Sequence, residues 1–177
     1  MRFLERTWAA GLLALAALVG LAALALSACA SDARGALSDT YDSPEQAAQA
    51  VLDALAARDA GRLLDLALDE HEFRLVVWPE LPSSRPEAGL PVEYAWGRLR
   101  LNSQSQLSMT IAVHGGRRYE LVAVRLRGET TRYATLRVHR DSELVLREPS
   151  GALRTVRLFG SLLERGGRWK VFSYVVD

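Results

Sequence analysis

The feature that most constrains this chain is an uncharged apolar run near its start that ends at its only cysteine. Arg2 and Arg6 precede the run, which covers residues 8–28 and consists mostly of Leu and Ala, and Cys29 follows at once. A positive start, an apolar stretch and small residues before a cleavage point are the pattern of an export signal. We therefore expect residues 1–28 to be a signal peptide that is removed from the mature protein.

The alternative is an uncleaved transmembrane anchor, because the run is close to the ~20 residues that a helix needs to span a bilayer. Such a helix has no need of a lone cysteine at its outer edge followed by Ala-Ser-Asp. The sequence therefore favours cleavage. In either case we expect the rest of the chain to lie outside the cytoplasm.

The remainder of the chain has the size and charge of one ordinary globular domain. Removing the first 28 of the 177 residues leaves 149, with 20 basic and 20 acidic side chains. A domain of this size can bury a substantial core. With no second cysteine, its stability must come from packing and not from intrachain disulfides. The formal neutrality, with no basic patch, argues against a nucleic-acid partner.

The residues around the cysteine resemble the bacterial lipobox, in which Leu, a small residue and Ala or Gly precede the modified Cys. Here they are Leu26-Ser27-Ala28-Cys29. The resemblance implies diacylglycerol on Cys29, cleavage before it and acylation of the new N-terminus, so that the protein is held on a membrane by its lipid. Ala30 follows where an Asp would retain the protein at the inner membrane, so the outer membrane is favoured if the host has one. Residues 29–42 are then a lipidated tether, small and polar in composition.

The first half of the remaining chain reads as helices. Ser43-Pro44-Glu45-Gln46 combines a capping residue, a proline for the first turn and a capping-box glutamine. We expect this helix to end near Arg58, with Gly61 marking the turn before a second short helix. The apolar positions of the first helix recur on one face: they are Ala47, Ala50, Val51, Ala54 and Leu55.

The middle of the chain is harder to assign. Residues 73–78 have the apolar, β-branched composition of a strand, and four prolines between 79 and 91 indicate a structured loop. Residues 92–113 fit both a helical stripe and, toward their end, a strand-like alternation. We favour a helix, because Gly115-Gly116 can then cap it.

The C-terminal half reads as antiparallel strands. We expect strands over 119–127, 132–140, 143–147, 153–164 and 168–176. Residues 132–140 alternate most cleanly, with apolar and polar side chains on opposite faces. Gly166-Gly167 indicates a hairpin turn before the last strand.

This order resembles the NTF2-like (SnoaL-like, cystatin-like) α+β fold over residues 43–177. Ser43-Pro44-Glu45-Gln46-Ala47 is similar to the family's usual opening, and Gly166-Gly167-Arg168-Trp169-Lys170-Val171 to its last turn and closing strand. The resemblance implies a cone: about three N-terminal helices packed on a curved antiparallel sheet of four to six strands, often around a pocket. Enzymes, binding modules and scaffolds all use this fold, so it names no function.

Candidate pocket residues come from the loop and from the alternating strand. The polar face of 132–140 borders either solvent or a pocket, and two tryptophans that flank the proline-rich loop are either a pocket lip or core anchors. The candidate pocket residues are Trp78, Trp96, Tyr133, Arg137 and His139. The spacing of the three histidines suggests no metal site, and no cofactor is expected.

Three functions remain open at this point. The first is a non-enzymatic module that binds a small apolar or mixed ligand, or another protein, because no acid–base constellation is visible in the sequence. The second is an isomerase- or hydrolase-like enzyme that uses the cone. The third is a structural domain that forms a homodimer.

Overall fold

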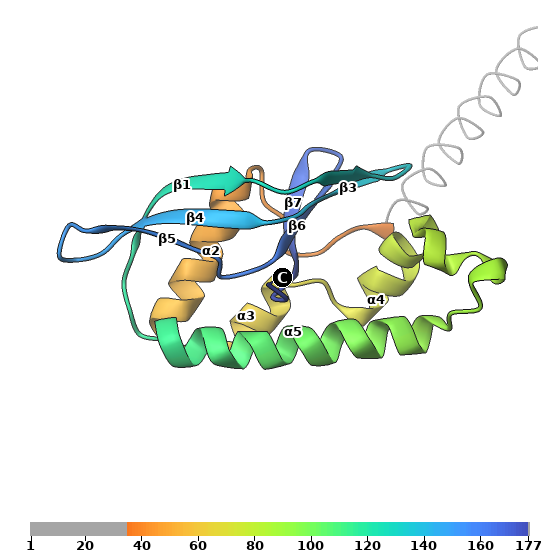
Figure 1. The fold of residues 1–177 in the computed structure, drawn as a ribbon, viewed down its shortest axis with the longest axis horizontal. Helices are drawn as coiled ribbons and strands as arrows, with labels where there is room; N and C mark the ends of the chain where they lie inside the picture. Colours follow the sequence, from red (N-terminus) through yellow and green to blue (C-terminus); the bar gives the residue numbers. More distant parts are fainter. Residues whose placement is uncertain (1–34, 177) are drawn as a thin grey trace, which may run out of the picture. The chain divides into compact units, whose positions relative to one another are not determined.

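The computed structural model describes residues 35–176, and the chain from Leu37 to Asp177 forms a compact unit of its own, here called the domain. The expected signal peptide and Cys29 lie outside the described residues. The domain is α+β, with helices followed by antiparallel strands, as expected (Figure 1). Its longer helical elements are α2 (Pro44–Ala57), α3 (Ala60–Leu66), α4 (Glu70–Glu72), the π-helical turn η2 (Phe73–Val77) and α5 (Val92–His114).

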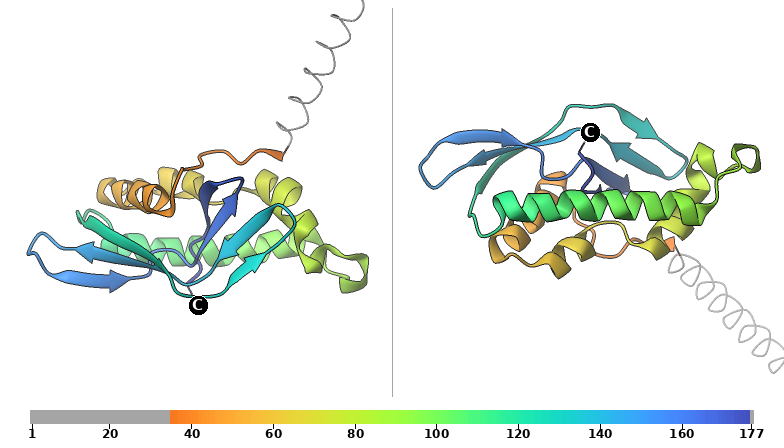
Figure 2. Two further views of the ribbon diagram at one scale, coloured as in Figure 1. Left: turned by 90° about the horizontal axis from the view of Figure 1, so that it is seen from above. Right: turned by 60° about the horizontal axis from the view of Figure 1, so that its bottom comes forward.

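The strands follow α5 and form two sheets. One has the order β1-β4-β5 and the other β2-β3-β6-β7, with every neighbouring pair antiparallel. In both views of Figure 2, α5 runs lengthwise along the domain, and β4 and β5 project at the end where α5 finishes. The strands are β1 (Glu120–Leu126), β2 (Thr130–Arg132), β3 (Leu136–His139), β4 (Ser142–Arg147), β5 (Leu153–Val156), β6 (Ser161–Arg165) and β7 (Arg168–Ser173).

The start of α2 follows its sequence signals closely. The Ser43 hydroxyl accepts a hydrogen bond from the Gln46 backbone N–H at 3.2 Å, and Pro44 occupies the first turn. The Gln46 side chain accepts from the backbone N–H of Asp42, one residue before the cap. At the other end Arg58 itself adopts the left-handed conformation that stops the helix, while Gly61 lies inside α3.

The prediction of a strand over residues 73–78 is wrong. Asp69 caps α4 through a complete capping box with Glu72, and the chain continues as helical turns through η2 into η3 (Trp78–Glu80). Phe73, Val76 and Val77 are all buried, and their i, i+3, i+4 spacing places them on one helical face. The β-branched composition indicated a strand, but the helical conformation is the one that buries these three side chains together.

The prediction of a helix over residues 92–113 is confirmed. Helix α5 covers Val92–His114, and at its end the Gly115 N–H donates to the Ile111 carbonyl at 2.8 Å. The proline-rich segment before it contains two further 3-10 turns, η4 (Pro82–Ser84) and η5 (Pro86–Ala88).

Two of the expected long strands are broken, which gives seven strands in the described residues where four to six were expected. Of residues 132–140, only Arg132 belongs to β2 and only Leu136–His139 to β3, and the turn between them is closed by a hydrogen bond from Tyr133 N–H to the Leu136 carbonyl at 2.9 Å. Residues 153–164 divide into β5 and β6. At this second break Gly160 lies against the backbone of Val175 so closely that a side chain there would overlap the carbonyl oxygen.

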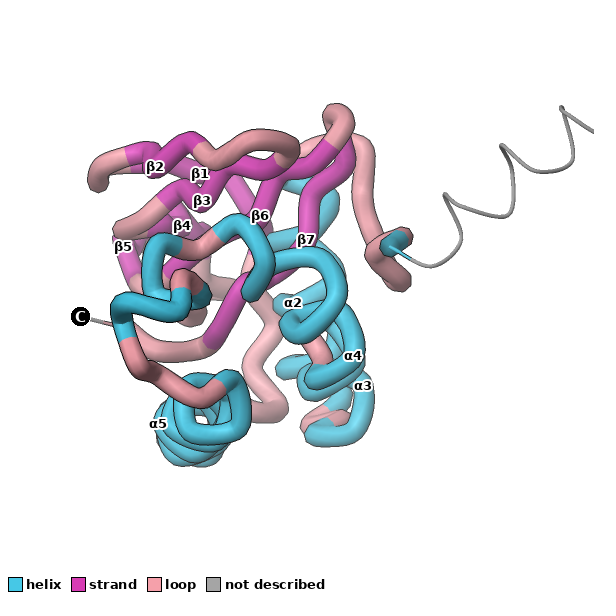
Figure 3. The backbone as a smooth tube through the Cα atoms, turned by 90° about the vertical axis from the view of Figure 1, so that its right-hand side faces the viewer, coloured by secondary structure: helices cyan, strands magenta, loops and turns pink. Residues whose placement is uncertain are grey.

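The domain has two hydrophobic clusters, both formed by residues from Leu37 onward. The first joins α2 and α3 to β4, β6 and β7, and the second joins η2 and the start of α5 to β3. Figure 3 shows α2, α3 and α4 stacked together beside the strands, with α5 seen end-on apart from them. Because these clusters need no residue before Leu37, we expect the domain to fold without the N-terminal segment.

The last residues of the expected tether belong to the domain. Tyr41 and Trp169 exchange two backbone hydrogen bonds of 2.8 Å, and Asp42 pairs with Arg168. Leu37 packs on the second hydrophobic cluster. Residues 37–42, here called the strap, are therefore held by the fold, and the domain begins before the Ser43 cap at which the sequence placed its start.

Candidate ligand-binding cleft beneath helix α5

Helix α5 buries few of its side chains against the rest of the domain. Of its 23 residues, only Trp96 and Leu107 are buried. Protein interiors are ordinarily packed as densely as organic crystals, so a long helix with so few buried side chains leaves space beneath it. Two cavities border its inner side.

The first, here called the Trp96 cavity, has a volume of about 390 Å³. It lies between α5 and the chain from the strap through α3 to α4. Its apolar wall consists of Leu64, Ala67, Leu68, Trp96, Leu99 and Phe172. Its polar border consists of Ser38, Asp39, Asp65, Asp69, Glu70, Arg100, Ser103 and Gln104. The indole N–H of Trp96 is buried and has no hydrogen-bond partner in the described part of the chain.

The second, here called the Arg140 cavity, has a volume of about 400 Å³. It lies between α5, the proline-rich turn η4 and the inner face of β3, β6 and β7. Its lining comprises Leu81, Pro82, Ser83, Leu99, Asn102, Tyr133, Val138, Arg140, Ser161, Phe172, Ser173 and Val175. Arg140 is the one charged side chain in this set, which contains no carboxylate.

The two cavities share the side chains of Leu99 and Phe172 as a common wall. Both residues are only half-buried and pack against the second hydrophobic cluster. The cavities are therefore neighbouring compartments of one cleft beneath α5. Each falls within the size range of small-molecule sites, roughly 300–1,000 Å³.

The structure divides the candidate pocket residues that the sequence suggested. Trp96 borders the Trp96 cavity and Tyr133 borders the Arg140 cavity. Trp78 packs on the second hydrophobic cluster and its ring lies 5.9 Å from that of Phe73, as a core anchor does. Arg137 and His139 border neither compartment of the cleft.

Arg137 and His139 lie on the opposite face of β3 from the cleft. Side chains alternate along a strand, and Val138, between them, lines the Arg140 cavity. On the other face, Arg137 and His139 both contact the Glu164 carboxylate, at 2.8 and 2.9 Å, and the His139 ring lies 4.8 Å from that of Trp169. Of this polar face, Tyr133 borders the Arg140 cavity, whereas Arg137 and His139 contact Glu164 on the far side of β3.

Glu164 is held as a carboxylate by this arrangement. Burial by itself would raise the pKa of Glu164, but the hydrogen bonds from His139 and Arg137 outweigh burial and lower it. Arg137 and Glu164 also border a shallow hollow of about 270 Å³ beside the Tyr133–Thr135 turn. Arg137 and Glu164 pair with each other there, and Thr135 pairs with Glu80, so these groups are already engaged.

Sequence reasoning missed several residues of the cleft. Leu99 and Ser103 belong to the helical stripe of residues 92–113, but nothing in that pattern distinguishes a cavity wall from a packed core. Arg140 follows the last residue of β3, where its polarity suggested only the end of a strand. Phe172 alternates with Val171 in the closing strand, and only the pairing of β6 with β7 decides which of them faces α5.

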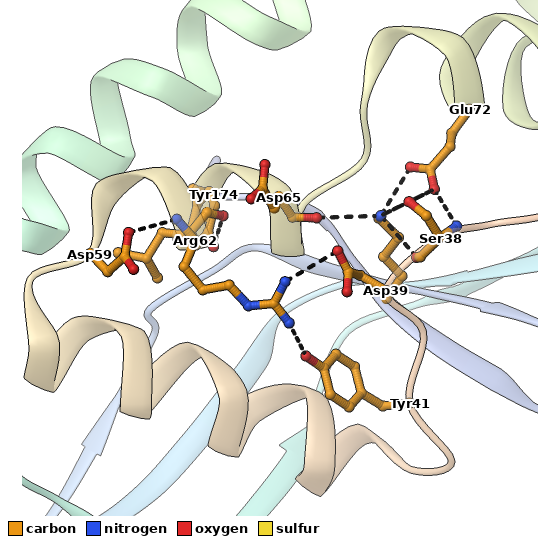
Figure 4. A network of polar contacts seen from close by, with 10 residues as sticks. Ser38, Asp39, Tyr41, Asp59, Arg62, Asp65, Glu72 and Tyr174 are labelled. Carbon is orange, nitrogen blue, oxygen red and sulfur yellow. Dashed lines mark hydrogen bonds and ion pairs between the residues drawn. The ribbon is translucent and has the colours of Figure 1, made fainter.

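A buried ion pair lies next to the Trp96 cavity. The Lys170 ammonium, 1% exposed, lies 3.1 Å from the Glu72 carboxylate, 3% exposed, and donates to the Ser38 carbonyl at 3.0 Å. The Ser38 hydroxyl and backbone N–H both donate to Glu72, at 2.9 and 2.7 Å (Figure 4). An ammonium surrounded by acceptors offers no lone pair for proton abstraction, so Lys170 and Glu72 do not resemble a catalytic dyad. Their contacts with Ser38 instead hold the strap against the domain.

A second contact of the strap lies beside the first. Arg62 of α3 forms an ion pair with Asp39 and donates to the Tyr41 hydroxyl, each at 3.1 Å (Figure 4). Ser38 and Asp39 both border the Trp96 cavity. The strap therefore forms part of the cavity wall and is held there by contacts to α3, α4 and β7.

Within residues 35–176, no group of three or more His, Cys, Asp or Glu side chains is placed to hold a metal ion. In the same part of the chain, no helix combines the length and apolar character needed to cross a membrane.

Comparison with known proteins gave no match: the chain shows no significant similarity to any family model, to any curated protein or to any solved structure.

Proposed function

We propose that this chain is an exported lipoprotein, anchored to a membrane through Cys29, whose NTF2-like domain binds a small amphipathic molecule in the cleft beneath α5. The observation that carries the binding function is the pair of neighbouring cavities, about 390 and 400 Å³, that share Leu99 and Phe172. Each cavity combines an apolar wall with polar side chains, which suits a molecule that has both an apolar and a polar part.

The NTF2-like assignment is supported by the order of elements and by where the cleft lies. Helices precede the antiparallel strands, and the Arg140 cavity lies against the face of β3, β6 and β7, where a cone-shaped fold would have its pocket. The lipid anchor is supported by the Leu26-Ser27-Ala28-Cys29 sequence alone.

Binding is favoured over catalysis by the state of the ionisable groups around the cleft. The Arg140 cavity is lined by neither a carboxylate nor a histidine. Of the acidic residues at the Trp96 cavity, Asp39 pairs with Arg62, Glu70 pairs with Arg74, and Asp69 caps α4. A general acid or base must be free to exchange a proton with a substrate. These three groups are already engaged, which leaves the exposed Asp65 as the one unengaged acid of the four at this cavity.

The test is a substitution that fills the shared wall. Residues 30–177, purified without the signal segment, are titrated with dodecanoate in a calorimeter and weighed by native mass spectrometry. Leu99→Trp places a large ring between the two cavities, and we expect it to abolish dodecanoate binding and any mass excess that disappears on denaturation.

The matched control is Leu101→Trp, two residues along the same helix on its outer side, where the side chain is 65% exposed. We expect this variant to bind as the unsubstituted protein does. Circular dichroism melting of both variants shows whether the fold is kept. No binding by the unsubstituted protein, or equal binding by both variants, would refute a site beneath α5.

A further inference from the structure

We propose that the ligand is a single-chain anionic amphiphile, with its acid group at Arg140 and its hydrocarbon chain passing Leu99 and Phe172 toward the Trp96 cavity. This inference rests on the proposed function, since it names the class of molecule that the same cleft takes. The juxtaposition that carries it is one cavity whose single charged lining residue is Arg140, beside another cavity bordered by four acidic residues, with Leu99 and Phe172 lining both.

The charges around the cleft are distributed unequally. The Trp96 cavity is bordered by four acidic residues and a single arginine, Arg100, whereas Arg140 is the only charged residue at the Arg140 cavity. Asp39 and Glu70 are neutralised by Arg62 and Arg74, but Asp65 and Asp69 have no ion-pair partner in the described part of the chain. A negative head is therefore favoured at the second compartment over the first. Charge therefore orients an anionic amphiphile in one direction along the cleft.

Arg140 has no competing partner within the fold. Among residues 35–176, no carboxylate lies within ion-pair distance of its guanidinium, and the next residue, Asp141, pairs with Arg157 instead. The backbone of Arg140 is held on both sides, because its N–H donates to the Glu129 carbonyl at 3.2 Å and its carbonyl accepts from Gly128 at 3.3 Å. The backbone of Arg140 is thus held in place, while its exposed side chain keeps its hydrogen-bond donors free.

The polar groups near Arg140 suit an oxyanion. Five neutral side chains that can donate hydrogen bonds share the lining of this cavity: Ser83, Asn102, Tyr133, Ser161 and Ser173. Hydroxyl and amide donors around a guanidinium recognise carboxylate or phosphate oxygens, and a guanidinium matches either acid group with a two-pronged hydrogen bond. The shared chemistry is therefore an anionic oxygen head on an apolar chain.

The Trp96 cavity suits the hydrocarbon chain of the ligand and not a second acid group. Leu64, Leu68 and Trp96 supply its apolar wall, together with Leu99 and Phe172, which it shares with the Arg140 cavity. A hydrocarbon chain that leaves water for this wall gains roughly 0.8 kcal/mol for each buried CH₂. Affinity should therefore rise with chain length, while the head determines orientation and selectivity.

The experiment compares ligands of one chain length and different heads. Residues 30–177 are titrated with dodecanoate, dodecyl phosphate, 1-dodecanol and dodecyltrimethylammonium, and with acetate and inorganic phosphate as heads without a chain. We expect both anionic amphiphiles to bind, the alcohol to bind about fivefold more weakly, and the cation and the chainless anions not to bind measurably. The ratio of dodecanoate to dodecyl phosphate affinity distinguishes the two acid classes.

The matching variant is Arg140→Gln, which removes the charge and keeps a hydrogen-bonding side chain. We expect it to weaken dodecanoate binding about fivefold, to leave 1-dodecanol binding unchanged, and to abolish the salt dependence of dodecanoate binding. The control variant is Arg98→Gln, because Arg98 is an exposed residue of α5 that lines neither cavity. This substitution should change none of these values.

The outcomes separate this inference from the proposed function. Equal affinities for dodecanoate and 1-dodecanol, or an Arg140→Gln variant that binds dodecanoate normally, would overturn the anionic head and leave the cleft intact. Tighter binding of dodecyltrimethylammonium would reverse the assigned orientation and overturn the inference. Failure of all the twelve-carbon ligands would reject the proposed function itself.

Discussion

The ammonium of Lys170 and the carboxylate of Glu72 lie 3.1 Å apart with both side chains almost wholly buried, and together they hold Ser38 of the strap. Lys170 is the chain's only lysine, on the closing strand β7, while Glu72 ends α4. The pair therefore joins three parts of the chain, and one of them is the strap, the last part of the expected lipidated tether.

Loss of one partner of this pair should destabilise the domain strongly. Lys170→Met leaves the Glu72 carboxylate buried without a cation, which costs about 3–5 kcal/mol of unfolding free energy. Urea unfolding of residues 30–177, with and without the substitution, measures this loss of unfolding free energy. The double variant Lys170→Met, Glu72→Met should lose clearly less than the sum of the two single variants, and strict additivity would show that the two groups do not interact.

An exposed ion pair provides the control for that measurement. Arg74 contacts Glu70 and Glu93 at 2.8 and 2.9 Å, but both carboxylates are more than half exposed. Glu93→Gln should therefore change the unfolding free energy far less than Lys170→Met does, because solvent screens the pair. A loss as large as that of Lys170→Met would contradict the role that we assign to burial.

The Glu164 carboxylate should make stability depend on acid pH. Its folded-state pKa lies below its ordinary value, so Glu164 contributes stability above the unfolded-state pKa, and this is lost as the pH falls through the folded-state pKa. Glu164→Gln should therefore be less stable than the unsubstituted protein at pH about 6, and the difference should shrink toward pH about 3. Urea unfolding across this range checks the prediction, which a difference independent of pH would contradict.

Two glycine substitutions should change stability in opposite directions. A Cβ at Gly160 would lie 1.6 Å from the Val175 carbonyl oxygen, so Gly160→Ala must displace backbone and should cost about 1–3 kcal/mol or more. Gly97, inside α5, has no neighbouring atom within 4 Å of such a Cβ, and Gly97→Ala should add about 0.5–1 kcal/mol. Thermal melts of the two variants should move to opposite sides of the unsubstituted protein.

Cys29 separates the two interpretations of the N-terminal segment. If it carries the lipid, Cys29→Ser should remove the acyl mass and block cleavage before residue 29, because a hydroxyl does not replace the thiol in acylation. The uncleaved precursor, with residues 1–28 still attached, should then accumulate. Mass spectrometry of the membrane fraction also shows the added acyl mass in the unsubstituted protein. A cysteine variant that keeps an unchanged mass and an unchanged membrane association would instead indicate a transmembrane anchor.

The expected and observed structures agree where the signals are local. Ser43, Pro44 and Gln46 start α2, the Gly166-Gly167 pair turns between β6 and β7, and residues 92–113 form a helix. Each of these depends on hydrogen bonds or backbone conformations within a few residues. The expectations that failed depended on contacts between distant segments.

The candidate pocket illustrates the same limit. Alternation correctly separated Val138 from Arg137 and His139, but it could not say which face meets α5. That choice follows from the pairing of β3 with β6, which brings Glu164 beside Arg137 and His139 and leaves Val138 facing the cleft. The polar face was the better candidate from sequence, because polar side chains usually avoid a core.

What the sequence by itself determined, then, is the α+β order, the first and last helices and the final hairpin, because periodicity, caps and glycine turns act along the chain. Tertiary structure alone decided that residues 73–78 are helical, that residues 132–140 and 153–164 are each broken, and that a cleft opens beneath α5. The physical reason is burial: which face of a segment leaves water depends on the surfaces packed against it, and those come from residues far away in the sequence.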